Sequence, residues 1–270
     1  MKKFITKITL FVTISLVIFS CSITKDLNQG NLILRSNEIF VNGLQISTDS
    51  LSPLLAQNKN TYLIGFPLAG KLYQSSKKNS DSIFNNWINK RLNREKKLNS
   101  VLSKKQVSQL NKYYKDLNNW KKKNGEKLEI IDSVKTKISI ENLKSYYKNN
   151  GYFNSKIYSK VIIDQNNNKF GKVIYDVKTG NQYILDSIST NIESEILESI
   201  YNLNKEKSIL KSNTIFNTKK FELERNRIDD LFKNSGIYDF QINSISFKIN
   251  LDTTNLKFNI PVEIIIKEKG

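Results

Sequence analysis

The sequence predicts an α+β protein made of two tandem modules, each ordered strand–helix–helix–strand–strand. The first observation is a repeat: residues 147–153 read YKNNGYF, and 85 residues later residues 232–238 read FKNSGIY. The second is that in each copy a glycine closes a helical pattern and precedes two runs that alternate as strands do. The third is a content of only 3 Pro and 10 Gly in 270 residues, which does not favour disorder.

Residues 1–20 have the pattern of a secretory leader. Three lysines lie before residue 8, and the apolar stretch 8–19 is too short to be a stable transmembrane helix. A small residue, Ser20, precedes Cys21 at the end of this stretch, as in a bacterial lipobox, so Cys21 is predicted to become a lipidated N-terminus. An ordinary secretory signal with an incidental cysteine is the alternative. Residues 21–30 are polar and are interpreted as a tether.

The first module is predicted to span residues 31–180. It begins with a strand over 32–41 that ends at the turn signal Asn42-Gly43. Ser50 is a plausible N-cap for a short helix with Pro53 in its first turn. Residues 65–73 form an apolar loop, for which burial is favoured over contact with a partner.

A helical hairpin is predicted over residues 81–123, inserted between the two core helices of the first module. Ser103 and Gln106 have the spacing of a capping box and start its second helix, which Asn124-Gly125 ends. One face of the first helix is predicted to carry Ile83, Phe84, Trp87, Ile88, Arg91 and Leu92, and the apolar positions of the second are Val107, Leu110, Tyr114, Leu117 and Trp120. The pattern favours a solvated arm with a narrow seam over a dedicated binding device.

After the insertion, a helix is expected from Ser139 to Gly151, which caps it. Two strands follow, and the second ends at Gly180. In the first of them one face is predicted to carry apolar side chains and the other face lysines. The apolar set is Ile157, Val161 and Ile163, and the lysines are Lys156 and Lys160.

The second module is predicted to span residues 181–270. Helices are expected over 193–203 and 218–233, with Gly236 ending the second. In the next strand the apolar residues change parity, which predicts a bulge near Asn243-Ser244. The last strand contains Pro261, which lacks a donor, so this strand is either locally broken or at an edge.

Composition excludes several function classes. There is no histidine and one cysteine, which excludes imidazole chemistry, an intramolecular disulfide and His- or Cys-based metal sites. Asp132, Asp164 and Asp186 are scattered, and no basic or nucleophilic residue lies at the spacing of a catalytic motif from any of them. No catalytic residue, metal or cofactor is therefore expected. The formal charge of +18 is compatible with nucleic acid, acidic proteins or anionic membranes. A composition bias along the whole chain is the favoured explanation, and the leader argues against nucleic acid.

The module order, with Lys-Asn-x-Gly-aromatic ahead of the strands, resembles the POTRA domain, the polypeptide-transport-associated module. The N-terminal half resembles the lipidated BamA/TamA-type assembly proteins of Bacteroidetes, the TamL group. The segments that carry this resemblance are Asn37–Gly43, Gly65–Leu68, Leu72-Tyr73, Phe84–Trp87, Gly125-Glu126 and Ile131–Ser133. The family continues into an outer-membrane barrel, whose many alternating strands of about ten residues are missing here. A truncated product or the periplasmic half of a machine is therefore expected.

The resemblance implies a periplasmic factor for outer-membrane protein assembly, held at the outer membrane through Cys21. Its partners would be outer-membrane protein clients or subunits of the assembly machine. Clients would add a strand to the second strand of a module, over residues 155–164 and 236–249. The residues implied for this contact are Lys156, Ile157, Tyr158, Lys160, Gln241 and Asn243, positioned by the turns at Gly151 and Gly236. The alternative is a structural envelope lipoprotein, an anchored spacer without client binding.

Overall fold

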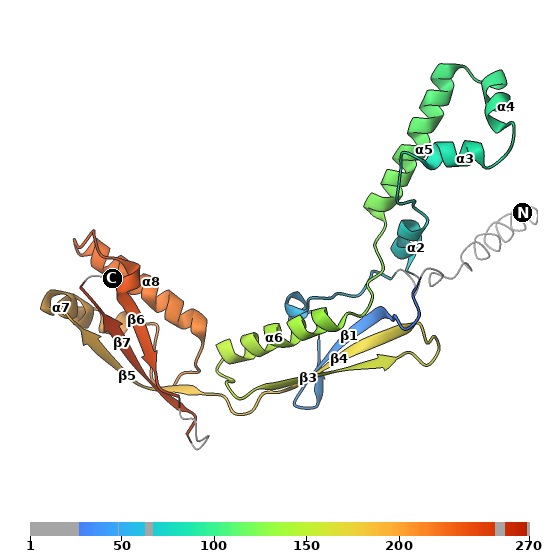
Figure 1. Cartoon of the computed structure of the whole chain (residues 1–270). Coiled ribbons are helices and arrows are strands. Elements are labelled where there is room, and N and C mark those ends of the chain that lie inside the picture. Colours follow the sequence, from blue (N-terminus) through green and yellow to red (C-terminus); the bar gives the residue numbers. More distant parts are fainter. Residues whose placement is uncertain (1–26, 48, 63–66, 252–256, 269–270) are drawn as a thin grey trace, which may run out of the picture. The chain divides into compact units, whose positions relative to one another are not determined.

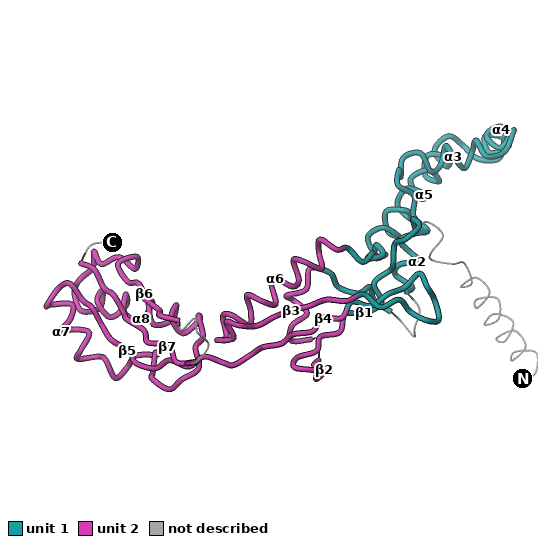
Figure 2. Tube along the Cα trace, turned by 60° about the horizontal axis from the view of Figure 1, so that its bottom comes forward, with its two compact units in different colours: residues 1–37, 57–132, 161–173 teal, residues 38–56, 133–160, 174–270 magenta. Residues whose placement is uncertain are grey.

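The computed structural model describes residues 27–47, 49–62, 67–251 and 257–268 of the chain. It has the α+β fold that the sequence predicts, with helices lying against two separate sheets (Figure 1). The chain divides into two compact units. One comprises residues 1–37, 57–132 and 161–173, and the other residues 38–56, 133–160 and 174–270 (Figure 2). Among the described residues, no helix is long and apolar enough to cross a membrane.

The first sheet has the order β2-β1-β4-β3. Its strands are β1 (Ile33–Val41), β2 (Leu44–Ile46), β3 (Lys156–Ile163) and β4 (Phe170–Lys178). The expected turn at Asn42-Gly43 is present, with φ of 50° and 86°, the conformation of a tight hairpin. This hairpin adds β2, so the sheet has four strands where the family resemblance implied three.

Helix α6 (Ser133–Asn149) covers one face of the first sheet. Its Leu143 is fully buried, as are Tyr175 and Val177 of β4. The short helix expected near Ser50 is a single 3-10 turn, η1 (Ser52–Leu54), with Pro53 in its first turn. The expected N-cap is wrong, because Leu51 is the N-cap and no side chain caps it.

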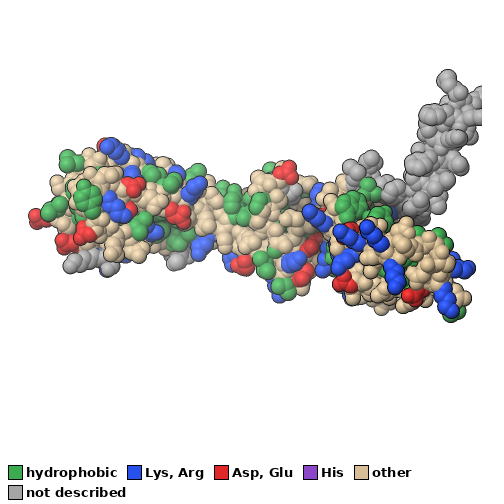
Figure 3. Space-filling view, turned by 90° about the horizontal axis from the view of Figure 1, so that it is seen from above, with side chains coloured by type: hydrophobic (Ala, Val, Ile, Leu, Met, Phe, Trp, Pro, Cys, Tyr) green, Lys and Arg blue, Asp and Glu red, His purple; other side chains and the backbone are tan. Residues whose placement is uncertain are grey.

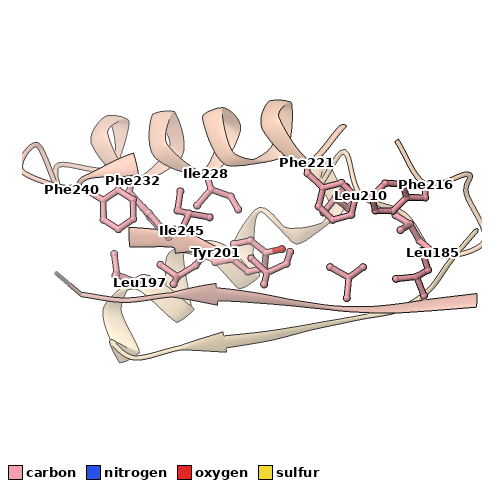
Figure 4. Packing of buried hydrophobic residues seen from close by; sticks show 14 of the residues in the cluster. Leu185, Leu197, Tyr201, Leu210, Phe216, Phe221, Ile228, Phe232, Phe240 and Ile245 are labelled. Carbon is pink, nitrogen blue, oxygen red and sulfur yellow. The ribbon is translucent and has the colours of Figure 1, made fainter. Parts of the chain in front are cut away.

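The second sheet has the order β5-β7-β6 and is covered by two full helices. Its strands are β5 (Ile184–Ile192), β6 (Ile245–Ile249) and β7 (Asn259–Ile266). The helices are α7 (Glu195–Leu203) and α8 (Thr218–Asn234), with 3-10 turns η2 (Lys205–Lys207) and η3 (Ile242–Ser244). Figure 4 shows the core between α8 and the strands, where Phe232 and Ile228 are fully buried. Burying each such side chain contributes about 1.5–3 kcal/mol.

The pairing of β7 shows which of the two alternatives for the last strand, a local break at Pro261 or a position at the sheet edge, is right. Strand β7 is central, pairing in parallel with β5 and antiparallel with β6, so the edge alternative is wrong. The β5–β7 register shifts between Leu185, opposite Ile260, and Ile188, opposite Val262. This irregularity lies at Pro261, where no N–H is available to the ladder. The predicted bulge near Asn243-Ser244 is wrong, because these two residues lie in the 3-10 turn η3 and β6 begins only at Ile245.

The insertion contains four helices, which we call the arm: α2 (Leu68–Gln74), α3 (Ile83–Asn89), α4 (Arg94–Val101) and α5 (Lys104–Asn124). The capping box of Ser103 and Gln106 is present. The first helix of the predicted hairpin is broken, because Asn93 is left-handed with φ of 65°. Leu92, expected on the apolar face, therefore lies in the connection and is 96% exposed.

Other expectations for the insertion are partly corrected. The rings of Phe84, Trp87 and Tyr114 pack together, with centroids 5.5–6.1 Å apart, as the apolar stripe predicts. Trp120, expected to continue the stripe, is instead 54% exposed. Residues 68–74 are helical where a loop was expected, and Gly65 and Phe66 lie outside the described residues.

The two repeated turns have the predicted conformation. Gly151 and Gly236 have φ of 87° and 96°. In each turn the glycine N–H donates to the carbonyl three residues back, and the next N–H donates to the carbonyl five residues back. This is the Schellman pattern, in which a left-handed residue satisfies the last helical carbonyls.

Candidate functional site

The two strands expected to receive a client are both edge strands. Strand β3 is at one end of the first sheet, and β6 is at one end of the second. Strand β6 begins only at Ile245, however, so Gln241 precedes the turn η3 and Asn243 lies within it. Lys156, Ile157, Tyr158 and Lys160 do lie on β3. The structure thus places four of the six predicted contact residues on an edge.

The opposite edge of the first sheet is occupied along part of its length. Strand β2 pairs with residues 39–41 of β1. Farther back, the Leu34 N–H donates to the Glu129 carbonyl and the Ile131 N–H donates to the Leu32 carbonyl, both at 2.8 Å. Within the described part of the chain, β3 is therefore the long edge of this sheet that has backbone groups available for pairing.

The register at the end of β3 identifies which backbone groups face outward. The Asp164 N–H donates to the Phe170 carbonyl at 2.9 Å across the hairpin. Backbone groups alternate in direction along a strand, so even-numbered residues of β3 hydrogen-bond to β4. The N–H and C=O groups of Ile157, Ser159 and Val161 consequently point to the open edge.

Asp164 fixes the turn that ends β3. The hydrogen bond from the Asn166 N–H to its carboxylate lowers the pKa of Asp164, and Arg35, which forms an ion pair with it, lowers the pKa further. These contacts therefore favour the ionised carboxylate and tie the turn after β3 to Arg35 of β1.

Strand β3 exposes apolar side chains on both faces. Tyr158 and Ile163 are each 53% exposed, Val161 46% and Ile162 38%. Ile157, Val161 and Ile163 lie at alternate positions of β3 and so share one face, as predicted, but Val161 and Ile163 on that face are exposed. Helix α6 lies over β4, and the other core helix is reduced to η1, so neither covers β3 as α7 and α8 cover the second sheet. Exposed apolar side chains on a strand that has one unpaired edge are typical of a surface that binds another chain.

Beside this edge lies a shallow groove of about 280 Å³ on the face of the sheet opposite α6. It is lined by Phe40, Gly43, Tyr158, Ser159, Lys160, Ile174 and Asp176. Phe40 and Ile174 were not predicted as site residues. The sequence gives only a weak indication of their role. Both are apolar and at even positions, so they lie on the face of the sheet opposite the core residues Ile39 and Tyr175, which are at odd positions. The groove combines an apolar floor with a lysine and an aspartate.

The edge at β6 has a different character. Ile245 is 2% exposed, and among the described residues of β6 no large apolar side chain is exposed. On its outer face Lys248 lies 3.5 Å from Glu263 of β7. Short strands with charged outer faces discourage further pairing, so β3 is the better candidate of the two edges. Cys21 lies outside the described residues.

No family model and no curated protein matches the chain. Many solved structures are similar to it, including the following three. The first, POTRA domains 3–5 of BamA from Haemophilus influenzae, is 20% identical with a TM-score of 0.31, over 53% of this chain and 52% of that one. The second, BamA from Haemophilus ducreyi lacking POTRA domains 1–3, is 13% identical with a TM-score of 0.33, over 54% and 25%.

The third similar structure contains POTRA domains 1–3 of the periplasmic domain of Omp85 from Anabaena. It is 12% identical with a TM-score of 0.28, over 89% of this chain and 67% of that one. The chain thus spans about half the length of the first of these structures and a quarter of the second.

Proposed function

We propose that this chain is the periplasmic POTRA-type region of an outer-membrane protein assembly factor, and that it binds client strands by β-augmentation at β3. We further propose that its two modules span residues 31–180 and 181–270, which the presence of two separate sheets with helices lying against them supports. The observation that carries the binding site is the edge β3 itself, because its outward backbone groups lie beside exposed Tyr158 and Val161.

An extended client would pair its backbone with Ile157, Ser159 and Val161, which requires little of the client's sequence. Alternate side chains of the added strand would then lie beside Tyr158 and Lys160, which line the side of the groove next to this edge. Outer-membrane strands alternate apolar and polar residues, so one face of each fits an apolar floor. The mechanism needs no catalytic group.

The edge is tested by Ser159→Pro. Proline removes the outward N–H and blocks pairing at the edge, while the bonds of the even-numbered residues to β4 remain. The variant and the unchanged chain are each titrated with a barrel-strand peptide, and binding is measured from NMR shifts of the backbone amides. The variant is expected to bind at least tenfold more weakly, a loss of about 1.4 kcal/mol in binding free energy.

Ser159→Ala is the matched control, since it removes the same hydroxyl and keeps the N–H. It should bind the peptide as the unchanged chain does, and both variants should keep the melting curve of the chain. Equal binding by the proline and alanine variants would show that β3 is not the edge used. Absence of binding by the unchanged chain would favour the anchored spacer instead.

We also propose that Cys21 is acylated and holds the chain at the outer membrane facing the periplasm. The leader and the residue before the cysteine support this. An anchor with more than one acyl chain gives stable attachment. Cys21→Ala should therefore abolish incorporation of labelled palmitate, measured in cells, and an unchanged label would contradict the proposal.

A further inference from the structure

The arm is not required by the fold that surrounds it. The second module joins α7 to α8 through residues 204–217, which include only the turn η2. The first module joins η1 to α6 through residues 55–132, which contain all four helices of the arm. The second sheet is therefore built and covered by its helices without such an insertion, so the fold by itself does not explain the charge and the exposed side chains of the arm.

The positive charge of the chain is concentrated in this insertion. Residues 57–132 contain 17 Lys and Arg against 6 Asp and Glu, a formal charge of +11 out of +18 for the chain. Residues 181–270 contain 12 against 13, a charge of −1. A composition bias along the whole chain would have charged both segments alike, so that explanation fails. Figure 3 shows Lys and Arg side chains gathered over the part of the molecule that the arm forms.

Exposed apolar side chains accompany this charge. Leu92, in the connection before α4, is 96% exposed, and Val101, at the end of α4, is 81% exposed. Tyr113 and Trp120 are 61% and 54% exposed, and seven residues apart they share one face of α5. The exposed lysines 105, 112 and 123 of α5 flank this face. Aromatic rings bordered by lysines are typical of helices that lie in a membrane interface.

The base of the arm adds a basic cavity of about 520 Å³. Lys78, Lys122 and Lys127 line it together with apolar side chains, among them Tyr73 and Leu128. The Lys122 Nζ donates to the Lys78 carbonyl at 2.7 Å, which holds that ammonium at the cavity wall. An acidic headgroup would find several cations beside an apolar surface here.

We propose that the arm binds the surface of an anionic lipid membrane, with Trp120, Tyr113 and Leu92 in the interface and its lysines on the lipid phosphates. The charge selects an anionic surface over a zwitterionic one. The exposed apolar side chains favour a membrane over an acidic polypeptide, which offers them no place to bury. This function goes beyond client binding and does not require β3 or acylation of Cys21.

The test is vesicle flotation of the chain without residues 1–21. The deletion ensures that neither the leader nor an acyl group contributes to binding, and it lies before Leu27, where the described residues begin. Binding is expected to vesicles containing phosphatidylglycerol, to weaken at high salt, and to be absent with phosphatidylcholine alone. The combined substitution of lysines 105, 112 and 123 by Glu should lower the partition coefficient roughly tenfold or more. The variant with Leu92→Ser and Trp120→Ser should also bind more weakly, at unchanged charge.

The matched control reverses the exposed lysines 205, 219 and 267 of the second module and should bind as the unchanged chain does. Circular dichroism checks that every variant keeps its helix content. Equal loss in the arm and control variants would overturn the proposal, because binding would then follow net charge alone. Binding to poly-glutamate without binding to vesicles would assign the arm to an acidic polypeptide and would overturn it as well.

Discussion

Replacing Arg227 with methionine is expected to destabilise the second module by about 3–5 kcal/mol, because Glu224 would stay buried without its ion-pair partner. Glu224 is 0% exposed. Its carboxylate accepts hydrogen bonds from Arg227 Nη2 at 2.6 Å and Nε at 3.0 Å. These hydrogen bonds raise the pKa of Arg227, so the guanidinium stays charged and the pair stays intact. Whole domains are stable by only about 5–15 kcal/mol.

The same carboxylate also connects α8 to the segment before it. The Ser208 hydroxyl donates to it at 2.9 Å and the Ile209 N–H at 2.7 Å. Replacing Glu224 and Arg227 together by leucine removes both charges but leaves the Ile209 N–H without this acceptor. We therefore expect the double variant to cost about 1–3 kcal/mol, less than Arg227→Met alone.

Denaturant unfolding measures these free energies, and hydrogen exchange of peptides from residues 205–230 assigns the loss to the second module. Lys219→Met is the control, since it removes a cation from an exposed position of the same helix and should change stability by at most about 0.5 kcal/mol. If Arg227→Met were no worse than Lys219→Met, the ion pair would not contribute to the fold.

Local signals in the sequence predicted the features that depend on neighbouring residues. The capping box at Ser103 and the left-handed glycines are examples, because their hydrogen bonds form within five residues. The position of β3 at a sheet edge came from the family resemblance, and the strand order agrees with it.

Features that depend on distant segments could not be predicted in this way. Alternation identified the face that carries Val161 and Ile163, but cover for that face depends on which helices form, and η1 is only one turn long. The ion pair of Glu224 and Arg227 lies three residues apart on a helix, where such pairs are usually exposed. Its burial follows from the packing of α8 against Ser208 and Ile209, which no local pattern encodes.

The two repeated glycines provide a second prediction, because they have the same conformation in different surroundings. Gly151 lies against the segment that leads into β5: its carbonyl accepts from the Tyr183 N–H at 2.9 Å. A Cβ at Gly151 would be 3.1 Å from the Tyr183 carbonyl oxygen and 3.2 Å from that of Phe216. At Gly236 a Cβ would meet no described atom within 4 Å.

The residues after each glycine differ in the same way. Phe153 packs its ring against Tyr183 and Phe216, with centroids 5.2 and 4.9 Å apart. Tyr238, at the equivalent position of the second copy, is 83% exposed. The first turn thus packs against the segments at Tyr183 and Phe216, whereas the second is a helix cap with open space around it.

Alanine at either glycine should cost about 1 kcal/mol, since a Cβ is strained at positive φ. Gly151→Ala should cost a further 1–3 kcal/mol or so, because two backbone carbonyls must move and the bond from Tyr183 is put at risk. Asparagine tolerates the left-handed region, so Gly236→Asn should be nearly as stable as the unchanged chain while Gly151→Asn remains destabilised. Denaturant unfolding of the four variants measures the difference. Equal losses at the two sites would mean that Gly151 acts only as a helix cap and that its contact with Tyr183 and Phe216 contributes nothing to stability.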